Sequence, residues 1–239
     1  EKSDLVESIS AAMFQLAQSK QKTGDYAGAA DVFKRIIIDY PDFTRADKAL
    51  FNAAFAYETG KMYVEAGREF ERVFDKFPNS PSAKEALLRS ARAYQTGRQF
   101  AFAAQIFLKY KDQLPADSQA VPCIFRAANM YDSAGDYLAS AKMYEVVYDV
   151  YIVNQKDAAK YRGSKEAAPE ALYSAGLIYE KARKFNDAIR IYQKLEQAFP
   201  GSPNAPEAVF SVAICYDSLG DTKKMAENYI GYTKRFAED

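Results

Sequence analysis

The sequence has no histidine and only two cysteines, and both shortages limit the chemistry that is available to it. Without histidine there is no usual general base near neutral pH and no Ser-His or Cys-His pair, and the commonest metal ligand is missing. Cys123 and Cys215 match neither a CxxC motif nor a zinc spacing, and no glycine-rich loop could cradle a phosphate. We therefore expect no enzymatic activity, no metal and no cofactor. We expect both cysteines to be buried as small apolar residues, two repeats apart and unbridged.

The chain also lacks an excess of charge and a long hydrophobic run. Its 239 residues include 32 Lys plus Arg and 32 Asp plus Glu, so the formal net charge is zero. Sequence-independent nucleic-acid binding depends on neutralised phosphates, so this balance argues against a nucleic-acid partner. No apolar stretch approaches the roughly 18 residues needed to span a bilayer. With 49% hydrophobic and 27% charged residues, the composition is that of a folded globular chain.

What the sequence does contain is an internal repeat, visible when the segments around its turns are stacked. An aromatic residue after the turn recurs every 37 residues, with one spacing of 48, at Tyr26, Tyr63, Phe100, Tyr137 and Phe185, with Thr222 in the sixth copy. Seven residues later every copy has a second aromatic, namely Phe33, Phe70, Phe107, Tyr144, Tyr192 and Tyr229. The period is therefore 37 residues, with an insertion of 11 residues between repeats four and five.

Each copy has the pattern of two helices joined by a Gly-containing turn. Before the turn, small residues stand three positions ahead of a mostly Tyr column, a spacing typical of one helix face, at Ala17, Ala54, Ala91, Ala128, Gly176 and Ala213. Prolines that cannot continue a helix interior end the hairpins at Pro41, Pro78, Pro115 and Pro200. Ser80 and Ser202, each followed by a proline, predict helix N-caps.

The predicted fold is all-α, with six helical hairpins and about twelve antiparallel helices. The first helix of each hairpin, called the A helix below, is expected near 4–22, 44–58, 81–95, 119–133, 165–181 and 204–218. A second helix of about 15 residues, the B helix, follows each of them. We expect one domain over residues 1–239, with repeats at roughly 4–43, 44–80, 81–117, 118–152, 165–203 and 204–239 and the insertion at about 152–164.

This arrangement resembles the tetratricopeptide repeat (TPR), and the resemblance covers essentially the whole chain. The family pattern of an aliphatic residue, a small residue, Tyr, turn Gly, an aromatic, Ala, an aromatic and Pro is matched nearly completely in repeats two, three and five. The sequence departs from the family in its period, which is usually 34 residues. The resemblance implies a TPR solenoid in a right-handed superhelix. It also implies that a protein or extended peptide binds in a concave groove lined by the A helices.

Two columns of residues on the A helices would line that groove. The first column follows the aliphatic anchors and comprises Phe14, Phe51, Leu88, Phe125, Tyr173 and Phe210. The second column stands four residues later and comprises Gln18, Phe55, Arg92, Asn129, Leu177 and Ile214. Alternatively, the aromatics of these columns pack between adjacent A helices. If a ligand buried each Phe fully, at roughly 1.5–3 kcal/mol apiece, two or three would suffice for a micromolar partner.

Two smaller features add candidate contacts. Arg89, Arg92 and Arg126 with Asn129 form a basic cluster that could hold one carboxylate of a partner, or the arginines could simply be solvated. In the insertion, Lys160, Tyr161 and Arg162 lie near the expected tip of a projecting hairpin. They are a candidate second contact with a protein, unless the insertion is ordinary family variation in which the neighbouring helices lengthen.

The sequences of the linkers between repeats are informative about where in the cell the protein acts. FPNSPSAKEAL from Phe77 and FPGSPNAPEAV from Phe199 look like linkers of bacterial envelope TPR proteins of the BamD and YbgF type. This resemblance implies a non-enzymatic scaffold for protein-protein interaction in envelope assembly or organisation, periplasmic or associated with the outer membrane, with room for a lipid anchor upstream. The alternative is a regulatory TPR domain of a larger protein, including a cytoplasmic one. A helical-repeat RNA binder is disfavoured by the apolar columns. The oligomeric state stays open.

Overall fold

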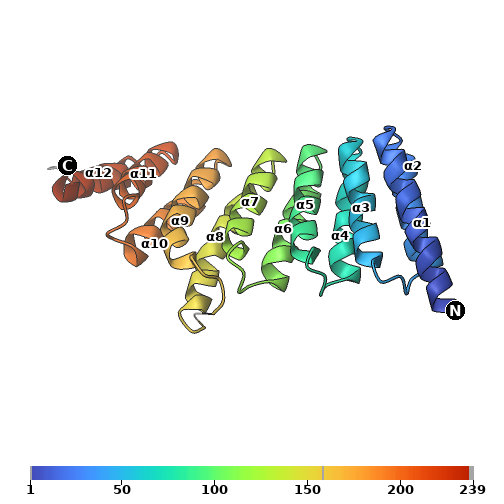
Figure 1. The fold of residues 1–239 in the computed structure, drawn as a ribbon. Coiled ribbons are helices and arrows are strands. Elements are labelled where there is room, and N and C mark those ends of the chain that lie inside the picture. The colour runs from blue at the N-terminus through green and yellow to red at the C-terminus, as the bar shows by residue number, and fades with distance from the viewer. Residues whose placement is uncertain (1, 158, 237–239) are drawn as a thin grey trace. The chain divides into compact units, whose positions relative to one another are not determined.

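The computed structural model describes residues 2–157 and 159–236, and within them all regular secondary structure is helical (Figure 1). Residues 1 and 237–239 of the predicted domain and residue 158 of the predicted insertion lie outside the described residues. The helices are α1 (Lys2–Lys22), α2 (Tyr26–Asp39), α3 (Ala46–Thr59), α4 (Tyr63–Lys76), α5 (Ala83–Thr96), α6 (Phe100–Gln113), α7 (Ala120–Ser133), α8 (Tyr137–Asn154), α9 (Ser164–Lys181), α10 (Phe185–Ala198), α11 (Ala205–Ser218) and α12 (Thr222–Phe236). The all-α prediction is confirmed.

The chain forms two compact units, unit 1 (residues 1–110) and unit 2 (residues 111–239), and the boundary falls within α6. Odd-numbered helices are the A helices, and their bounds agree with the predicted ones to within two residues. Within each unit, consecutive helices pack against one another, from α1 to α5 in unit 1 and from α7 to α12 in unit 2. In the third hairpin, Tyr94 of α5 stacks on Phe102 of α6 with 5.5 Å between ring centroids. The TPR hairpin is thus the building block of both units.

The turn between the helices of a hairpin depends on one backbone conformation. The residue two positions before each B helix has a positive φ, between 57° and 84°, at Gly24, Lys61, Arg98, Gly135, Arg183 and Gly220. The aligned glycines therefore occupy two different positions. In the second hairpin the glycine is Gly60, the C-cap of α3, whose φ is −76°. A Cβ there would lie 2.6 Å from Met62 Cε and 2.9 Å from Tyr26 Cβ. Close packing, and not a positive φ, is therefore the reason for glycine at this position.

The predicted N-caps are wrong. Helix α5 begins at Ala83 rather than after Ser80, its N-cap residue is Ser82, and no side chain caps it. The Ser80 hydroxyl instead donates a 2.7 Å hydrogen bond to Asp47 Oδ2 and accepts one from the Ser82 amide. Ser202 likewise accepts from the amide of Asn204, and α11 begins at Ala205. Both serines therefore stabilise the linker before the helix and not the helix itself.

Both cores are built from the columns seen in the sequence. The small-residue column is buried in all six hairpins. The second aromatic column is buried from Phe33 to Tyr192, whereas Tyr229 is half-buried on α12, a helix with no buried residue in its described part. Both cysteines are fully buried and unbridged, as expected, and burial raises the pKa of Cys123 to about 11 and that of Cys215 to about 12. The cysteines are therefore packing residues.

The insertion lengthens the two helices beside it. Helices α8 and α9 each contain 18 residues, whereas α7, α10 and α11 each contain 14. In unit 2 the end of α8 and the connection to α9 extend past the end of α7 (Figure 1). Four extra residues are close to one helical turn, so the faces of α8 and α9 keep their orientation toward the core.

Candidate partner-binding surfaces

The first column mostly packs within its own hairpin. Each of its rings lies against the aromatic residue 19 positions later on the B helix. The pairs with their centroid distances are Phe14–Phe33 at 5.0 Å, Phe51–Phe70 at 5.2 Å, Phe125–Tyr144 at 5.6 Å, Tyr173–Tyr192 at 5.9 Å and Phe210–Tyr229 at 5.4 Å. Phe14 is buried, and Phe51, Phe125 and Tyr173 are half-buried. These rings therefore fix the A helix against its own B helix, a contact that neither sequence alternative named.

The second column is exposed in every repeat. Gln18, Phe55, Arg92, Asn129, Leu177 and Ile214 are all exposed. Three of them are large apolar side chains with 38–44% of their surface accessible, namely Phe55, Leu177 and Ile214. A large apolar side chain that a fold leaves accessible is available to a partner. The second column is therefore exposed throughout, whereas in the first column Phe210 is the exposed aromatic, at 40%.

In unit 1 the second-column residue Phe55 shares an arginine with Phe51. The Arg89 guanidinium lies 5.7 Å from the Phe51 ring centroid and 5.8 Å from that of Phe55. The same guanidinium pairs with Glu58 at 2.9 Å and with Glu85 at 2.8 Å. Because two carboxylates already neutralise it, Arg89 is poorly suited to capture a further carboxylate. It positions the aromatic surface instead.

The other members of the predicted basic cluster are placed as follows. Arg92 is exposed on α5, and no ion pair involving its side chain is present among the described residues. In unit 2, Arg126 donates to Gln119 Oε1 at 3.2 Å, and Asn129 Oδ1 accepts a 2.8 Å hydrogen bond from the Tyr144 hydroxyl. Arg89 and Arg92 thus belong to unit 1, and Arg126 and Asn129 belong to unit 2. A shared carboxylate site stays a prediction.

In unit 2 the predicted apolar residues lie on two A helices that contact each other. Tyr173 and Leu177 are on α9, and Phe210 and Ile214 occupy the same register 37 residues later on α11. Phe210 is 40% exposed although its ring packs on Tyr229 and Tyr232, each with centroids 5.4 Å apart. These four side chains give unit 2 a larger exposed apolar area than the Phe51 and Phe55 pair gives unit 1.

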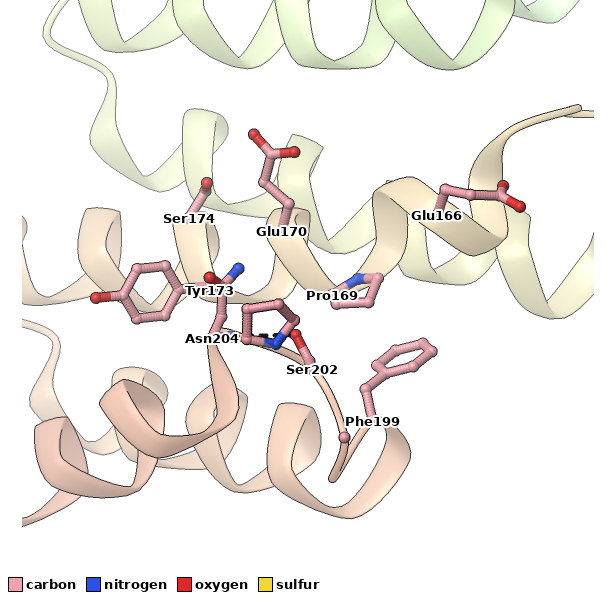
Figure 2. A pocket seen from close by; sticks show the side chains of 10 residues that line it. Glu166, Pro169, Glu170, Tyr173, Ser174, Phe199, Ser202 and Asn204 are labelled. Carbon is pink, nitrogen blue, oxygen red and sulfur yellow. Dashed lines mark hydrogen bonds between the residues drawn. The ribbon is translucent and has the colours of Figure 1, made fainter. Parts of the chain in front are cut away.

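A cavity next to this apolar area was not predicted. It has a volume of about 770 Å³ and is lined by residues 166–174 of α9 and 199–204 of the linker before α11. Figure 2 shows Tyr173 and Pro169 on α9 facing the linker that carries Ser202 and Asn204. Columns on one helix face do not reveal the space between a helix and a linker.

The three predicted residues of the insertion differ in availability. Tyr161 is half-buried against the core of unit 2, and its amide donates a 2.7 Å hydrogen bond to the carbonyl of Pro115. Lys160 is exposed and pairs with Asp157 at 3.4 Å. Arg162 is exposed and borders an apolar cavity of about 190 Å³ that also contacts Phe125. Tyr161 therefore anchors the loop, and only Lys160 and Arg162 present their side chains outward.

Comparison with solved structures returns repeat proteins of the same kind. A repeat protein from Podosopora anserina with nearly identical TPR-like repeats is 15% identical, covering 78% of this chain and 93% of that one, with a TM-score of 0.45. A TPR protein from Parabacteroides merdae is 13% identical over 92% and 77% of the two chains, with a TM-score of 0.42. The C-terminal part of a TPR protein from Cytophaga hutchinsonii is 14% identical over 93% and 80%, with a TM-score of 0.43. At these values the likenesses say nothing about partners.

Sequence comparison is more informative. No curated protein is similar enough to count as a relative. Residues 170–202 match a tetratricopeptide repeat profile, and residues 7–133 match the profile of YfiO, described as an outer membrane lipoprotein. Among the described helices, none has both the length and the apolar character that crossing a bilayer requires. Because the YfiO match extends over more than half of the sequence, the chain belongs to the YfiO family of outer membrane lipoproteins.

Proposed function

We propose that this chain is a non-enzymatic scaffold that binds a protein or an extended peptide through the exposed faces of its A helices. Its place is the bacterial cell envelope, in the periplasm or at the outer membrane, where it contributes to envelope assembly or organisation. Membership of an outer membrane lipoprotein family and the TPR match support this location and this type of function. The scaffold needs no catalytic group, in keeping with a sequence that contains no histidine.

The observation that carries the proposal is the exposed second column. On α9 and α11, Leu177 is 44% exposed and Ile214 is 38% exposed, at the same register in two A helices that contact each other. Phe210 at 40% enlarges this area. A folded chain gains nothing by holding three large apolar side chains in water, whereas a partner that covers them gains hydrophobic free energy.

The size of that gain determines what kind of partner fits. Full burial of a large apolar side chain contributes roughly 1.5–3 kcal/mol, so covering the remaining 40% or so of one contributes about 1 kcal/mol. Micromolar binding requires about 8 kcal/mol net of association costs. The expectation that two or three aromatic residues suffice is therefore wrong, because the fold already buries much of each ring. The partner must be an extended segment or a folded surface that contacts several repeats.

The test is site-specific photocrosslinking with a benzoylphenylalanine side chain in cells that make the protein. The probe is placed at Leu177 or Ile214, and the crosslinked product is identified by mass spectrometry. Leu138 and Ile152 on α8 are matched controls, since they are similarly exposed apolar residues, at 42% and 37%, on a B helix of the same unit. We expect one envelope protein to be crosslinked from the A-helix positions and not from α8.

Two results would contradict the proposal. Equal crosslinking from α8 and from the A helices would show that the second column does not select the partner. Crosslinking of cytosolic proteins alone would remove the envelope role and favour a regulatory TPR domain. A serine pair, Leu177→Ser with Ile214→Ser, then measures the contribution to binding, with Leu138→Ser and Ile152→Ser as its control.

A further inference from the structure

The cavity at the start of α9 is lined by both apolar and polar residues, and the fold leaves it open. Its volume of about 770 Å³ is sufficient for several side chains. Pro169 and Tyr173 line it from α9 and Phe199 lines it from the linker (Figure 2), as does Pro203. Tyr173 packs against Tyr192 with 5.9 Å between ring centroids, and burial is the main cause that raises its pKa to about 12. The ring is therefore a fixed surface on which a ligand can stack.

The charged residues that line this cavity are all acidic. Glu166 and Glu170 are both exposed, and no Lys or Arg contributes to the lining. Within residues 2–157 and 159–236, neither carboxylate forms an ion pair. Glu166 lies in the first turn of α9, where the helix dipole favours an acid, but Glu170 lies one turn further on, where that effect has faded. Glu170 is nonetheless an ordinary helix former at an exposed position, so it is its place at the cavity, not its presence in the helix, that matters here.

The carboxylates are arranged to meet an extended ligand rather than a single ion. Figure 2 shows Glu166 and Glu170 extending from α9 in different directions. In the described part of the chain no group of His, Cys, Asp or Glu residues is suited to hold a metal. A lining in which aromatic and proline side chains stand beside separate acids complements a polypeptide segment whose basic side chains flank an apolar or aromatic residue.

We propose that this cavity binds a partner segment with two basic residues, one beside Tyr173 and Glu170 and the other at Glu166. A guanidinium stacks on an aromatic face and pairs with carboxylates through its N–H groups. This proposal specifies the chemistry of the partner in the proposed scaffold function, and it therefore rests on that function. It also continues into the second column, because Glu170, Tyr173 and Leu177 follow one another at helical spacing on α9.

That continuity predicts a spacing in the partner. Seven residues of helix separate Glu170 from Leu177, which corresponds to about 10 Å along the axis of α9. An extended chain covers that distance in about three residues. A segment that lies along α9 should therefore carry a basic residue about three positions from an apolar one, with the basic residue at the cavity and the apolar residue on Leu177.

The experiment measures fluorescence anisotropy with a labelled ten-residue peptide that contains arginine and leucine three positions apart and a second arginine beyond the first. The matched peptide carries citrulline, a neutral isostere, in place of both arginines. The protein is used as the wild type, as the Glu166→Gln, Glu170→Gln variant, and as a control with the same change in net charge, Glu65→Gln, Glu227→Gln. Both control residues are exposed, lie on α4 and α12, and are not among the residues that line the cavity.

We expect the arginine peptide to bind the wild type and the control at least tenfold more tightly than it binds the Glu166→Gln, Glu170→Gln variant. We also expect the arginine peptide to bind the wild type at least tenfold more tightly than the citrulline peptide does. This difference in affinity should become smaller as the salt concentration increases. Equal affinity for wild type and cavity variant would overturn the inference, and so would equal affinity of the two peptides or no binding at millimolar peptide. In each of those cases the proposed function stands if the envelope partner is still crosslinked from Leu177 and Ile214.

Discussion

Gly176 on α9 is a helix glycine that the packing does not allow to become alanine. A Cβ at this position would lie 2.2 Å from Tyr192 Cε1 and 2.5 Å from its Cζ. Carbon atoms in contact are about 3.5–4 Å apart, so the ring would have to move by about 1.3 Å. Tyr192 is fully buried and its hydroxyl donates a 2.5 Å hydrogen bond to Glu180, so this movement would break the bond.

The magnitude follows from three terms of different sign. Overpacking a core costs roughly 1–3 kcal/mol, and weakening a hydrogen bond to a charged acceptor costs about 1.5 kcal/mol or more. Replacing a helix glycine by alanine stabilises by about 1 kcal/mol. We therefore expect Gly176→Ala to lower the free energy of unfolding by about 2–3 kcal/mol. Gly231→Ala on α12 should instead raise it slightly, because nothing lies within 4 Å of that Cβ.

Urea unfolding followed by circular dichroism measures both variants, and hydrogen exchange of α9 and α10 amides supplies a local measurement, since repeat arrays can unfold in parts. A double-mutant cycle isolates the clash. In a Tyr192→Leu background, Gly176→Ala should be neutral or stabilising. If Gly176→Ala is as stable as the wild type, or if its effect is unchanged in the Tyr192→Leu background, then the ring does not restrict this position and the reasoning is refuted.

Three further predictions concern backbone strain, acid sensitivity and thiol reactivity. Lys61→Gly should raise the free energy of unfolding, measured by urea titration, by about 0.5–1 kcal/mol. Lys61 has φ 60°, and the left-handed conformation is strained for a residue with a side chain. This strain costs more than the larger conformational entropy that glycine gives up on folding. Burial opposes ionisation of Glu145, but hydrogen bonds from Arg190 and Tyr179 outweigh burial and lower the pKa of Glu145. The stability advantage of the wild type over Glu145→Gln should therefore be complete above about pH 5 and shrink as the pH falls below about 4.5. An advantage that does not depend on pH would contradict this. Cys123 and Cys215 should react with a disulfide reagent at pH 8 only after unfolding, because burial raises both pKa values to about 11 and 12; rapid labelling of the folded protein would contradict their burial.

The sequence predicts the helices well because the packing of a TPR hairpin repeats at fixed spacing. Small and aromatic columns at helical intervals identify every A helix to within two residues. Local rules fail where a contact from another repeat intervenes. Ser80 has the local features of a helix cap, but its hydroxyl bonds to Asp47, which is 33 residues away. The turn glycines form one column in the sequence but two positions in the structure, since Lys61 takes the left-handed position and Gly60 the crowded one.

The candidate site was only half predictable for the same reason. The spacing of the second column shows that its residues share a face with the first column, but it does not show which of the two the B helix covers. That depends on the ring 19 residues later, whose contact with the first column leaves the second column exposed. The cavity beside Tyr173 lies between a helix and a linker about 30 residues further along the chain. No periodic pattern on one helix can reveal such a space.

The first column packs against the B helix and the second column is exposed, and this difference has a measurable consequence. Because the Phe51 ring packs edge-to-face on Phe70 with centroids 5.2 Å apart, Phe51→Ala removes a core contact and should lower the free energy of unfolding by about 2–3 kcal/mol. Leu177 is 44% exposed, so Leu177→Ser should change stability by about 0.5 kcal/mol at most and still weaken partner binding. The two readouts are urea unfolding and crosslinking yield. If Leu177→Ser destabilised the protein as much as Phe51→Ala, the second column would be part of the packed fold, and the proposal that a partner binds to it would lose its support.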